Sequence, residues 1–350
     1  PPEGLRDWGL FLHLTLAYLA TYTFWTIFSI PHNALGAELT MDYHERTLLT
    51  GVREGLGILG TLIGTLAPPF FAAHFGSESK GFSYLAATTG GLTALFIFIC
   101  FFSVKENPEF QRRSRVALGA GLRALYRNRP FRTLVIAFVA ALIGNAFVPL
   151  LLLYVADYVV GLPDAAPYII FTYILAAATS IPFWTRLSRR IGKKETWSRA
   201  LILGSVAFAL GTYIHEGTLI AWGLLALFAG FAYGCTMAMA PSMMADVIDM
   251  DELQTGKRRE GAYFGIWSFI DKSALGVAVF VGMHALALAG YEPNVEQTTR
   301  VIWTIKTLYF ILPAVCFATS CYLLRYYPIT QQEHARIRTE IEAKLIDRAV

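Results

Sequence analysis

The sequence predicts an all-α protein that crosses a membrane many times, with nine transmembrane helices of an expected twelve. Composition gives the first reason: 55% of the 350 residues are hydrophobic and only 15% are charged, whereas soluble domains carry about 25% charged residues. The mean hydropathy is +0.49. The other two reasons are the long apolar runs and the one-sided distribution of basic residues between them. A single soluble core of this size cannot bury such an apolar excess.

The apolar runs have the length of membrane helices. A bilayer core requires about 20 mostly apolar residues in a helix, and nine segments of the chain meet this requirement. Several contain proline, which membrane helices tolerate because neighbouring groups satisfy the freed backbone atoms. The nine predicted spans are 8–30, 50–73, 82–103, 132–159, 166–184, 197–214, 219–240, 261–289 and 302–325.

The basic residues between these runs lie almost entirely on one side. Alternate segments carry 23 Lys and Arg residues, whereas the opposite segments carry only Arg6, Lys80 and Arg300. Loops rich in Lys and Arg stay in the cytoplasm. We therefore expect residue 1 outside and residue 350 in the cytoplasm. The basic segments are 31–49, 104–132, 184–199, 241–260 and 325–350.

The long basic loop has three runs before it and six after it. It predicts a partial N-terminal bundle at 1–104, a cytoplasmic central loop at 105–131, a six-helix bundle at 132–325 and a cytoplasmic tail at 326–350. If the loop joins equal halves, three further spans precede residue 1. The alternative is a complete nine-helix protein.

Two segments six spans apart share a sequence pattern. TGVREG at 50–55 opens one span, and TGKRREG at 255–261 opens another. Each follows an acidic cytoplasmic segment that begins with Pro31 or Pro241. Duplicated halves are frequent in transporters, so the pattern indicates an internal repeat.

The residues of this repeat also carry a family resemblance. The stretch IPHNALGAELT at 30–40, continued to Arg53, resembles the region of helices IV and V in the glycoside–pentoside–hexuronide:cation symporters. The stretch PSMMADVIDMDE at 241–252 resembles the helix X–XI loop of that family even more closely. The family is the melibiose-permease branch of the major facilitator superfamily. The resemblance covers about residues 9–325 and implies a major facilitator fold that lacks family helices I–III.

Lys272 is the most informative single position. It lies about 12 residues into the span 261–289, or about 18 Å along a helix, close to the middle of the bilayer. A charge at this depth is costly and marks a candidate functional site; the alternative is a structural ion pair between helices. The resemblance implies that Lys272 matches a helix XI lysine beside the sugar and cation sites. It also implies that Ser268 matches a hydroxyl residue of the cation pocket.

Four further residues complete the candidate site. Arg53 lies near a helix end, where it would either reach the interface or, as the resemblance implies, hold substrate oxygens with its planar fork. Trp25, Ser29 and Asn33 share one helix face, on which the indole offers a flat surface and the amide both donates and accepts. The alternative is a packed aromatic and a helix-end amide. By the resemblance, Ser29 replaces an aspartate of the sodium site. The coupling ion therefore stays open between Na⁺ and H⁺, and transport without a coupling ion is the alternative.

Charged residues on the cytoplasmic side form a second candidate group. Exposed ion pairs contribute little individually, but a network between two halves would hold one access state closed. The alternative is charge that only sets topology. The proposed gate network contains Asp42, Glu45, Arg46, Asp246, Asp249, Asp251, Glu252, Arg258 and Arg259.

The resemblance implies cation-coupled symport of a sugar, glycoside or uronide by alternating access. We expect a monomer in the bacterial inner membrane, with no nucleic-acid partner, no metal site and no cofactor beyond the coupling ion. The alternatives are a lysolipid or amphiphile transporter of the same fold, a non-transporting sensor or channel, and an intramembrane enzyme. The sequence contains no GxxxxGK[ST], HExxH, CxxC or GxSxG motif, so no common phosphate-binding or catalytic motif supports an enzyme.

Overall fold

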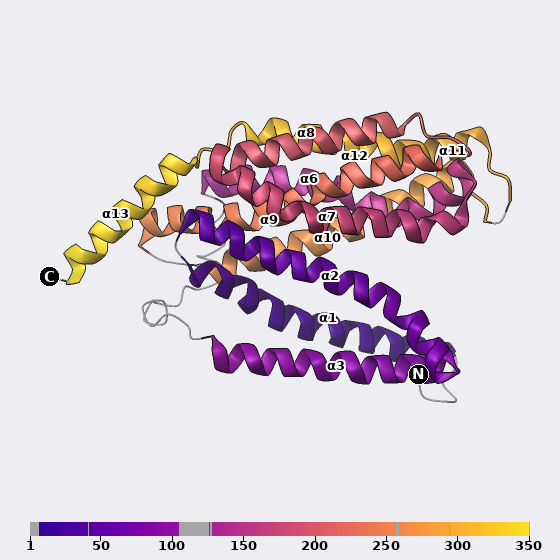
Figure 1. Ribbon diagram of the computed structural model, residues 1–350, viewed down its shortest axis with the longest axis horizontal. Coiled ribbons are helices and arrows are strands. Elements are labelled where there is room, and N and C mark those ends of the chain that lie inside the picture. Colours follow the sequence, from indigo (N-terminus) through magenta and orange to yellow (C-terminus); the bar gives the residue numbers. More distant parts are fainter. Residues whose placement is uncertain are drawn as a thin grey trace.

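The computed structural model describes residues 7–40, 42–104, 126, 128–256, 259–293 and 295–349. All regular structure within these residues is helical (Figure 1). Short π and 3-10 segments, η1 (Ala156–Val160), η2 (Pro163–Ala165) and η3 (Thr307–Ile311), extend or join the α-helices. The α-helices are α1 (Asp7–Glu38), α2 (Tyr43–Phe75), α3 (Glu78–Ser103), α6 (Arg129–Val155), α7 (Ala166–Ile191), α8 (Lys193–Gly211), α9 (Leu219–Thr255), α10 (Glu260–Ala289), α11 (Thr299–Lys306), α12 (Leu312–Leu324) and α13 (Gln331–Ala349).

Each predicted run coincides with one helix or one continuous helical rod. Within the described residues, seven helices are long and apolar enough to cross a membrane: α1, α3, α6 with η1, α7 with η2, α9, α10, and the rod from α11 to α12. The runs 50–73 and 197–214 form α2 and α8, which are not among the seven. The fold is therefore an all-helical membrane fold, and the nine spans stay a prediction.

The boundaries differ most at the helix ends that the sequence predicts to be cytoplasmic. The predicted acidic loop after residue 240 continues α9 for about four more turns, because Pro241 is accommodated within the helix and the next breaker is Gly256. Gly256 adopts a left-handed φ of 65°, which favours glycine and ends the helix. The α2 helix likewise begins before the predicted span, at the N-cap Asp42. Asp246 and Asp249 are therefore held on a rigid helix.

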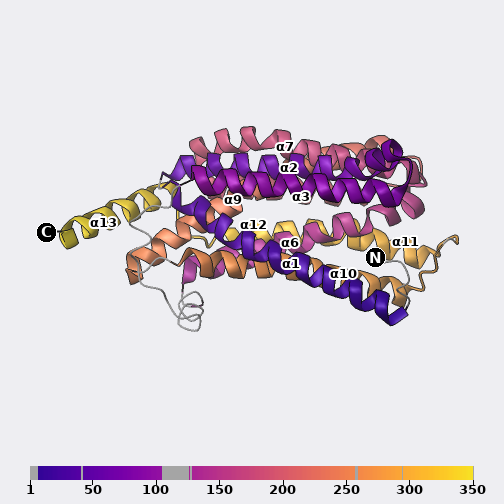
Figure 2. The same cartoon turned by 90° about the horizontal axis from the view of Figure 1, so that it is seen from below.

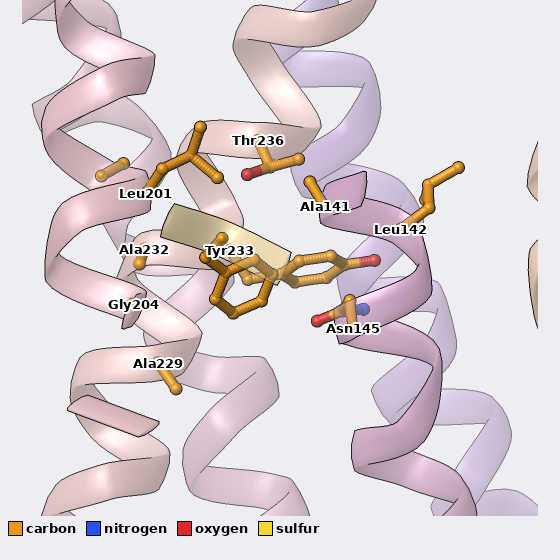
Figure 3. Close-up of a pocket in the computed structure, with 11 residues that line it drawn as sticks. Ala141, Leu142, Asn145, Leu201, Gly204, Ala229, Ala232, Tyr233 and Thr236 are labelled. Atoms are coloured by element: carbon orange, nitrogen blue, oxygen red, sulfur yellow. The ribbon is translucent and has the colours of Figure 1, made fainter. Parts of the chain in front are cut away.

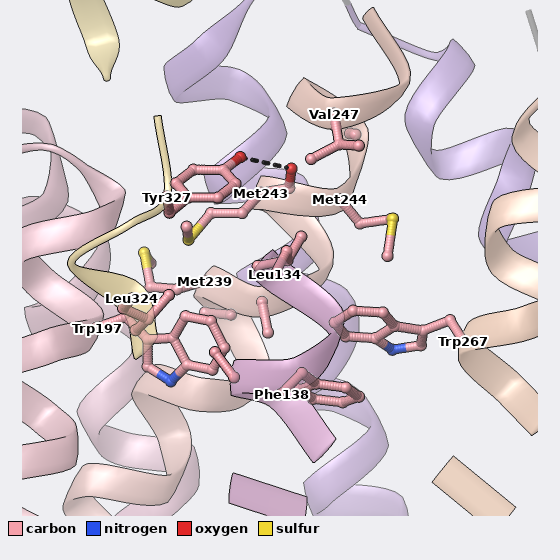
Figure 4. Packing of buried hydrophobic residues seen from close by; sticks show 14 of the residues in the cluster. Leu134, Phe138, Trp197, Met239, Met243, Met244, Val247, Trp267, Leu324 and Tyr327 are labelled. Atoms are coloured by element: carbon pink, nitrogen blue, oxygen red, sulfur yellow. Dashed lines mark hydrogen bonds between the residues drawn. The ribbon is translucent and has the colours of Figure 1, made fainter. Parts of the chain in front are cut away.

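The helices after residue 128 form one bundle with close contacts. A Cβ atom on Gly230 would lie 2.1 Å from the Tyr173 carbonyl oxygen, and one on Gly234 would lie 2.2 Å from the Ala177 carbonyl oxygen. Glycine thus lets α9 approach the backbone of α7, as small residues do in membrane bundles. Near the end of this bundle that is predicted to be cytoplasmic, Phe138 and Trp267 stack at 3.6 Å between ring centroids (Figure 4).

The three N-terminal helices contact this bundle in two places. The α1 helix packs against α10, whereas α2 packs against α7 and α9 and carries α3 on its outer side (Figures 1 and 2). The predicted tail contains the helix α13, which contacts α9 and extends from the end of the bundle that carries the basic loops (Figure 1). The central loop 105–131 falls largely outside the described residues, and the division into domains stays a prediction.

Candidate functional site

Lys272 joins α10 to α1 through a neutral partner. Its ammonium donates a hydrogen bond to the Thr26 hydroxyl at 2.5 Å and lies 5.8 Å from the centroid of the Tyr22 ring. Among the described residues, no carboxylate lies within ion-pair distance of the ammonium. The half-buried charge is therefore held by a hydroxyl and an aromatic face. This is not the structural ion pair that the sequence allowed as an alternative.

Arg53 forms an ion pair with the carboxylate of the next residue, Glu54. Its guanidinium bonds to Glu54 through Nη2 at 2.7 Å and Nε at 3.2 Å, and 23% of the Arg53 side chain is exposed. The guanidinium faces α1 at Gly36, where an added Cβ would lie 3.3 Å from its Nη1 atom. The Arg53 fork thus lies between α1 and α2 with part of its donor set still accessible.

The other predicted site residues remain separate. Trp25 is 60% exposed on α1, because the next residue, Thr26, takes the position that faces Lys272. Ser29 and Asn33 are half-buried on α1, and Ser268 is half-buried on α10. Between described residues, these four side chains form no hydrogen bond. The structure therefore joins Lys272 to α1 but does not join it to Arg53 or Asn33.

The predicted cytoplasmic charges contain a buried ionic cluster. Arg46 of α2 donates to both carboxylate oxygens of Asp249 on α9, at 2.5 and 3.2 Å, and lies 3.6 Å from Asp246. The Arg46 Nε donates to the Thr40 carbonyl at 3.0 Å. Next to this pair, the hydroxyls of Thr47 and Ser242 lie 3.0 Å apart. A charged pair with this bidentate geometry and burial is among the stronger side-chain contacts in proteins.

Two residues outside the predicted network complete this cluster. Lys193, at the start of α8, donates to both Asp246 oxygens at 2.7 and 2.8 Å. His334 of α13 places Nε2 3.0 Å from Asp249 and 3.6 Å from Asp246. Burial lowers the pKa of Lys193 to about 8, although Asp246 favours its charged form. We call the five residues Arg46, Lys193, Asp246, Asp249 and His334 the latch; at most 2% of each is exposed.

The remaining predicted gate residues have other contacts. Arg259 pairs with Asp251 at 2.7 Å, within the C-terminal bundle. Asp42 caps α2 by accepting from the backbone of His44 and Glu45, which lowers the pKa of the Asp42 carboxyl. Glu45 accepts from Thr40 at 2.5 Å, and Glu252 is buried. Arg258 lies outside the described residues.

Sequence reasoning identified the acidic half of the latch and one arginine, but it did not include His334. A signal for it exists: His334, Ile337 and Ile341 recur at helical spacing and are all buried, which is the pattern of an amphipathic helix that packs on a partner. Lys193 lies in the basic segment 184–199, which the sequence predicts to be cytoplasmic.

Comparisons with known proteins agree with this architecture. The family described as "MFS/sugar transport protein" matches residues 2–331. The chain is 26% identical to the glucuronide carrier protein homolog of Escherichia coli, over 97% of this chain and 75% of that protein. It is 27% identical to the isoprimeverose transporter of Lactiplantibacillus pentosus, over 94% of this chain and 70% of that protein. It is 24% identical to human sodium-dependent lysophosphatidylcholine symporter 1, over 98% of this chain and 68% of that protein.

Solved structures support the fold. The Escherichia coli fucose:proton symporter superposes with a TM-score of 0.61 at 16% identity, covering 86% of this chain and 73% of that chain. These relatives are transporters and not enzymes. The chain therefore belongs to the MFS/sugar transport protein family. Its relatives are consistent with membership of the glycoside–pentoside–hexuronide symporters within that family.

Proposed function

We propose that the protein moves a sugar, glycoside or uronide together with Na⁺ or H⁺ across the bacterial inner membrane by alternating access. One observation carries this proposal. Lys272, deep in an apolar helix, is held by a neutral hydroxyl across the α1–α10 contact, which leaves its charge available for a solute. An intramembrane charge without an acidic partner is expected where a polar pathway runs. The proposal includes nine spans, arranged as two bundles that the loop 105–131 joins.

The latch would close the cytoplasmic side of the site around Lys272. It connects α2 to α9 and fixes both to α8 and α13 through buried charges. With the cytoplasmic ends held together, a solute would reach Lys272 from outside. Opening to the cytoplasm would require these bonds to break, and water would then have to hydrate the separated charges. Such two-state contacts between bundles are the usual element of alternating access.

Arg53, Trp25 and Asn33 would complete the substrate site around Lys272 once the bundles move. Ser29 and Ser268 would contribute neutral hydroxyl ligands to the cation, which suits Na⁺ because hard cations prefer oxygen ligands. A lysolipid is the second candidate substrate, because vertebrate relatives are named as lysophosphatidylcholine symporters.

The test is uptake into vesicles that contain the protein expressed from its complete coding sequence. We expect a labelled methyl glucuronide or isoprimeverose to accumulate when a Na⁺ or a proton gradient is imposed, and an ionophore to abolish the accumulation. Comparing the two gradients identifies the ion. Uptake of lysophosphatidylcholine alone would move the assignment to the second candidate, and no gradient-driven uptake of either class would refute the proposal.

Two variants test the site itself. Lys272→Ala and Arg53→Ala should each abolish accumulation, whereas Lys80→Ala, an exposed lysine at the start of α3, should leave it unchanged. The protein is expected to act as a monomer, which the mass of the purified protein in detergent would test. Unchanged uptake by both site variants would contradict the assigned site.

A further inference from the structure

A cavity of about 300 Å³ lies between α6, α7 and α9, apart from the residues assigned to the proposed site. Its walls are mainly aliphatic and aromatic, including Val148, Leu152, Ile170, Ile174 and Leu225. Thr61 of α2 also lines it, so the cavity reaches the contact between the two bundles. Concave apolar sites of this size with a few polar groups are typical of small-molecule binding.

Two of the polar groups of this cavity are bonded to each other. The Tyr173 hydroxyl donates to the Asn145 Oδ1 atom at 2.6 Å, and the rings of Tyr173 and Tyr233 stack with centroids 5.6 Å apart. Figure 3 shows the side chains of Tyr233 and Asn145 facing each other between α6 and α9. A sugar ring requires many free donors and acceptors, which these walls do not offer. The walls suit an apolar group.

Thr61 connects the cavity to the helix that carries Arg53. It lies eight residues after Arg53 on α2, or about 12 Å along the helix. A molecule with a polar and an apolar part could therefore place its polar part toward Arg53 and its apolar part among the side chains around Ile174.

We propose that this cavity binds the apolar aglycone of a glycoside substrate, such as a phenyl or short branched alkyl group. This inference rests on the proposed transport of a glycoside and adds the chemical class of its non-sugar part. The size is suitable, because an apolar cavity of about 150 Å³ holds one benzene molecule, and this cavity is about twice as large. Each buried methylene strengthens binding about fourfold, so a ring-sized group should change affinity measurably.

The experiment compares a matched pair of inhibitors, methyl and phenyl β-glucuronide, against uptake of labelled methyl glucuronide into vesicles. We expect the phenyl compound to inhibit at a concentration at least about tenfold lower, from the area it buries. Ile174→Trp should fill the cavity and bring the two compounds close to equal potency, with the methyl compound unaffected. Ile174→Ala should instead increase the advantage of a bulkier naphthyl glucuronide, which keeps the test informative if the tryptophan variant does not fold.

Leu153→Trp is the matched control, because Leu153 lies on the same helix as the cavity residue Leu152 but is 62% exposed. Equal potency of the two compounds on the unaltered protein, or an unchanged ratio in both Ile174 variants, would overturn this inference while uptake continues. Absence of any glycoside uptake would contradict the proposed function instead. In that case, thermal-shift binding of the two compounds to the purified protein still tests whether the cavity binds an apolar aglycone. Selective stabilisation of the protein by the phenyl compound supports this binding, and equal or absent stabilisation refutes it.

Discussion

Arg46 of α2 and Asp249 of α9 form a two-point ionic contact between segments 203 residues apart, with donor–acceptor distances of 2.5 and 3.2 Å. Both side chains are at most 1% exposed. Removing one member of a buried pair leaves an uncompensated charge and costs roughly 3–5 kcal/mol. This contact is therefore the place where a single substitution should most change the balance between the closed and the open state of the proposed cytoplasmic gate.

Arg46→Ala should open the cytoplasmic side. With Asp249 deprived of its guanidinium partner in the closed state, we expect a cysteine introduced at the buried position Ala245 to react at least about a hundredfold faster with a cytoplasmic alkylating reagent, from the lower end of that range. Arg46→Lys should give an intermediate effect, because an ammonium cannot reproduce the planar fork. Arg336→Ala is the control, since its ion pair with Glu333 is exposed. Equal reactivity in all variants would show that the contact does not hold the gate.

Lys193 should make gate opening depend on pH. In the closed latch, burial lowers the pKa of Lys193 to about 8, whereas a hydrated lysine has a pKa of about 10.4. The open state therefore binds more protons between these values, and opening becomes less favourable as pH rises through 8. The cysteine reactivity at position 245, corrected for the reagent's own pH dependence, should fall over this range. The fall should disappear in Lys193→Met; a fall that persists there would have another source.

His334 should stabilise the closed gate from the tail helix. Its imidazole contacts Asp249 at 3.0 Å in a buried position, so His334→Ala leaves one carboxylate oxygen with fewer partners and should raise reactivity at position 245 by about tenfold, as loss of one buried hydrogen bond to a charged group does. Glu340→Ala on the exposed face of the same helix should have no effect. If removal of the helix after residue 328 has no effect either, α13 does not contribute to the gate.

Thr26 should matter through Lys272. Replacing the Thr26 hydroxyl with a methyl group, Thr26→Val, removes the acceptor of the 2.5 Å bond and should weaken uptake severalfold, while Lys272→Met should abolish uptake. Thr23→Val is the matched control, because its hydroxyl bonds within α1 to Leu19. If Thr26→Val behaves like Thr23→Val, the bond has no role in positioning the ammonium.

The fold was predictable because apolar length and basic-residue asymmetry are properties of the chain itself. The latch was predictable only in part. The sequence places Arg46, Asp246 and Asp249 on the same side of the membrane, but their pairing depends on how α2 packs on α9. His334 was not predictable from apolar runs, because α13 is too polar to resemble a span. Its buried stripe with Ile337 and Ile341 is visible only when the tail is treated as a helix.

The partner of Lys272 illustrates a second limit. Trp25 and Thr26 are adjacent in sequence and about 100° apart on the helix, so a modest rotation of α1 decides which one meets the ammonium. Sequence spacing selected the face with Trp25, Ser29 and Asn33, whereas packing of α1 against α10 selected Thr26. Lys272 itself was identifiable as a candidate site residue, because a charge in the middle of an apolar run is costly and marks a functional site.

The most direct test of the gate is the distance between spin labels at Leu48→Cys on α2 and Gln254→Cys on α9, both exposed positions beside the latch. We expect a short, narrow distance distribution without solute. Addition of a transported glycoside with the coupling ion should introduce a longer component, and Arg46→Ala should produce that component without solute. A distance distribution that stays short and unchanged while the protein transports the glycoside would contradict the assignment of the latch as the cytoplasmic gate.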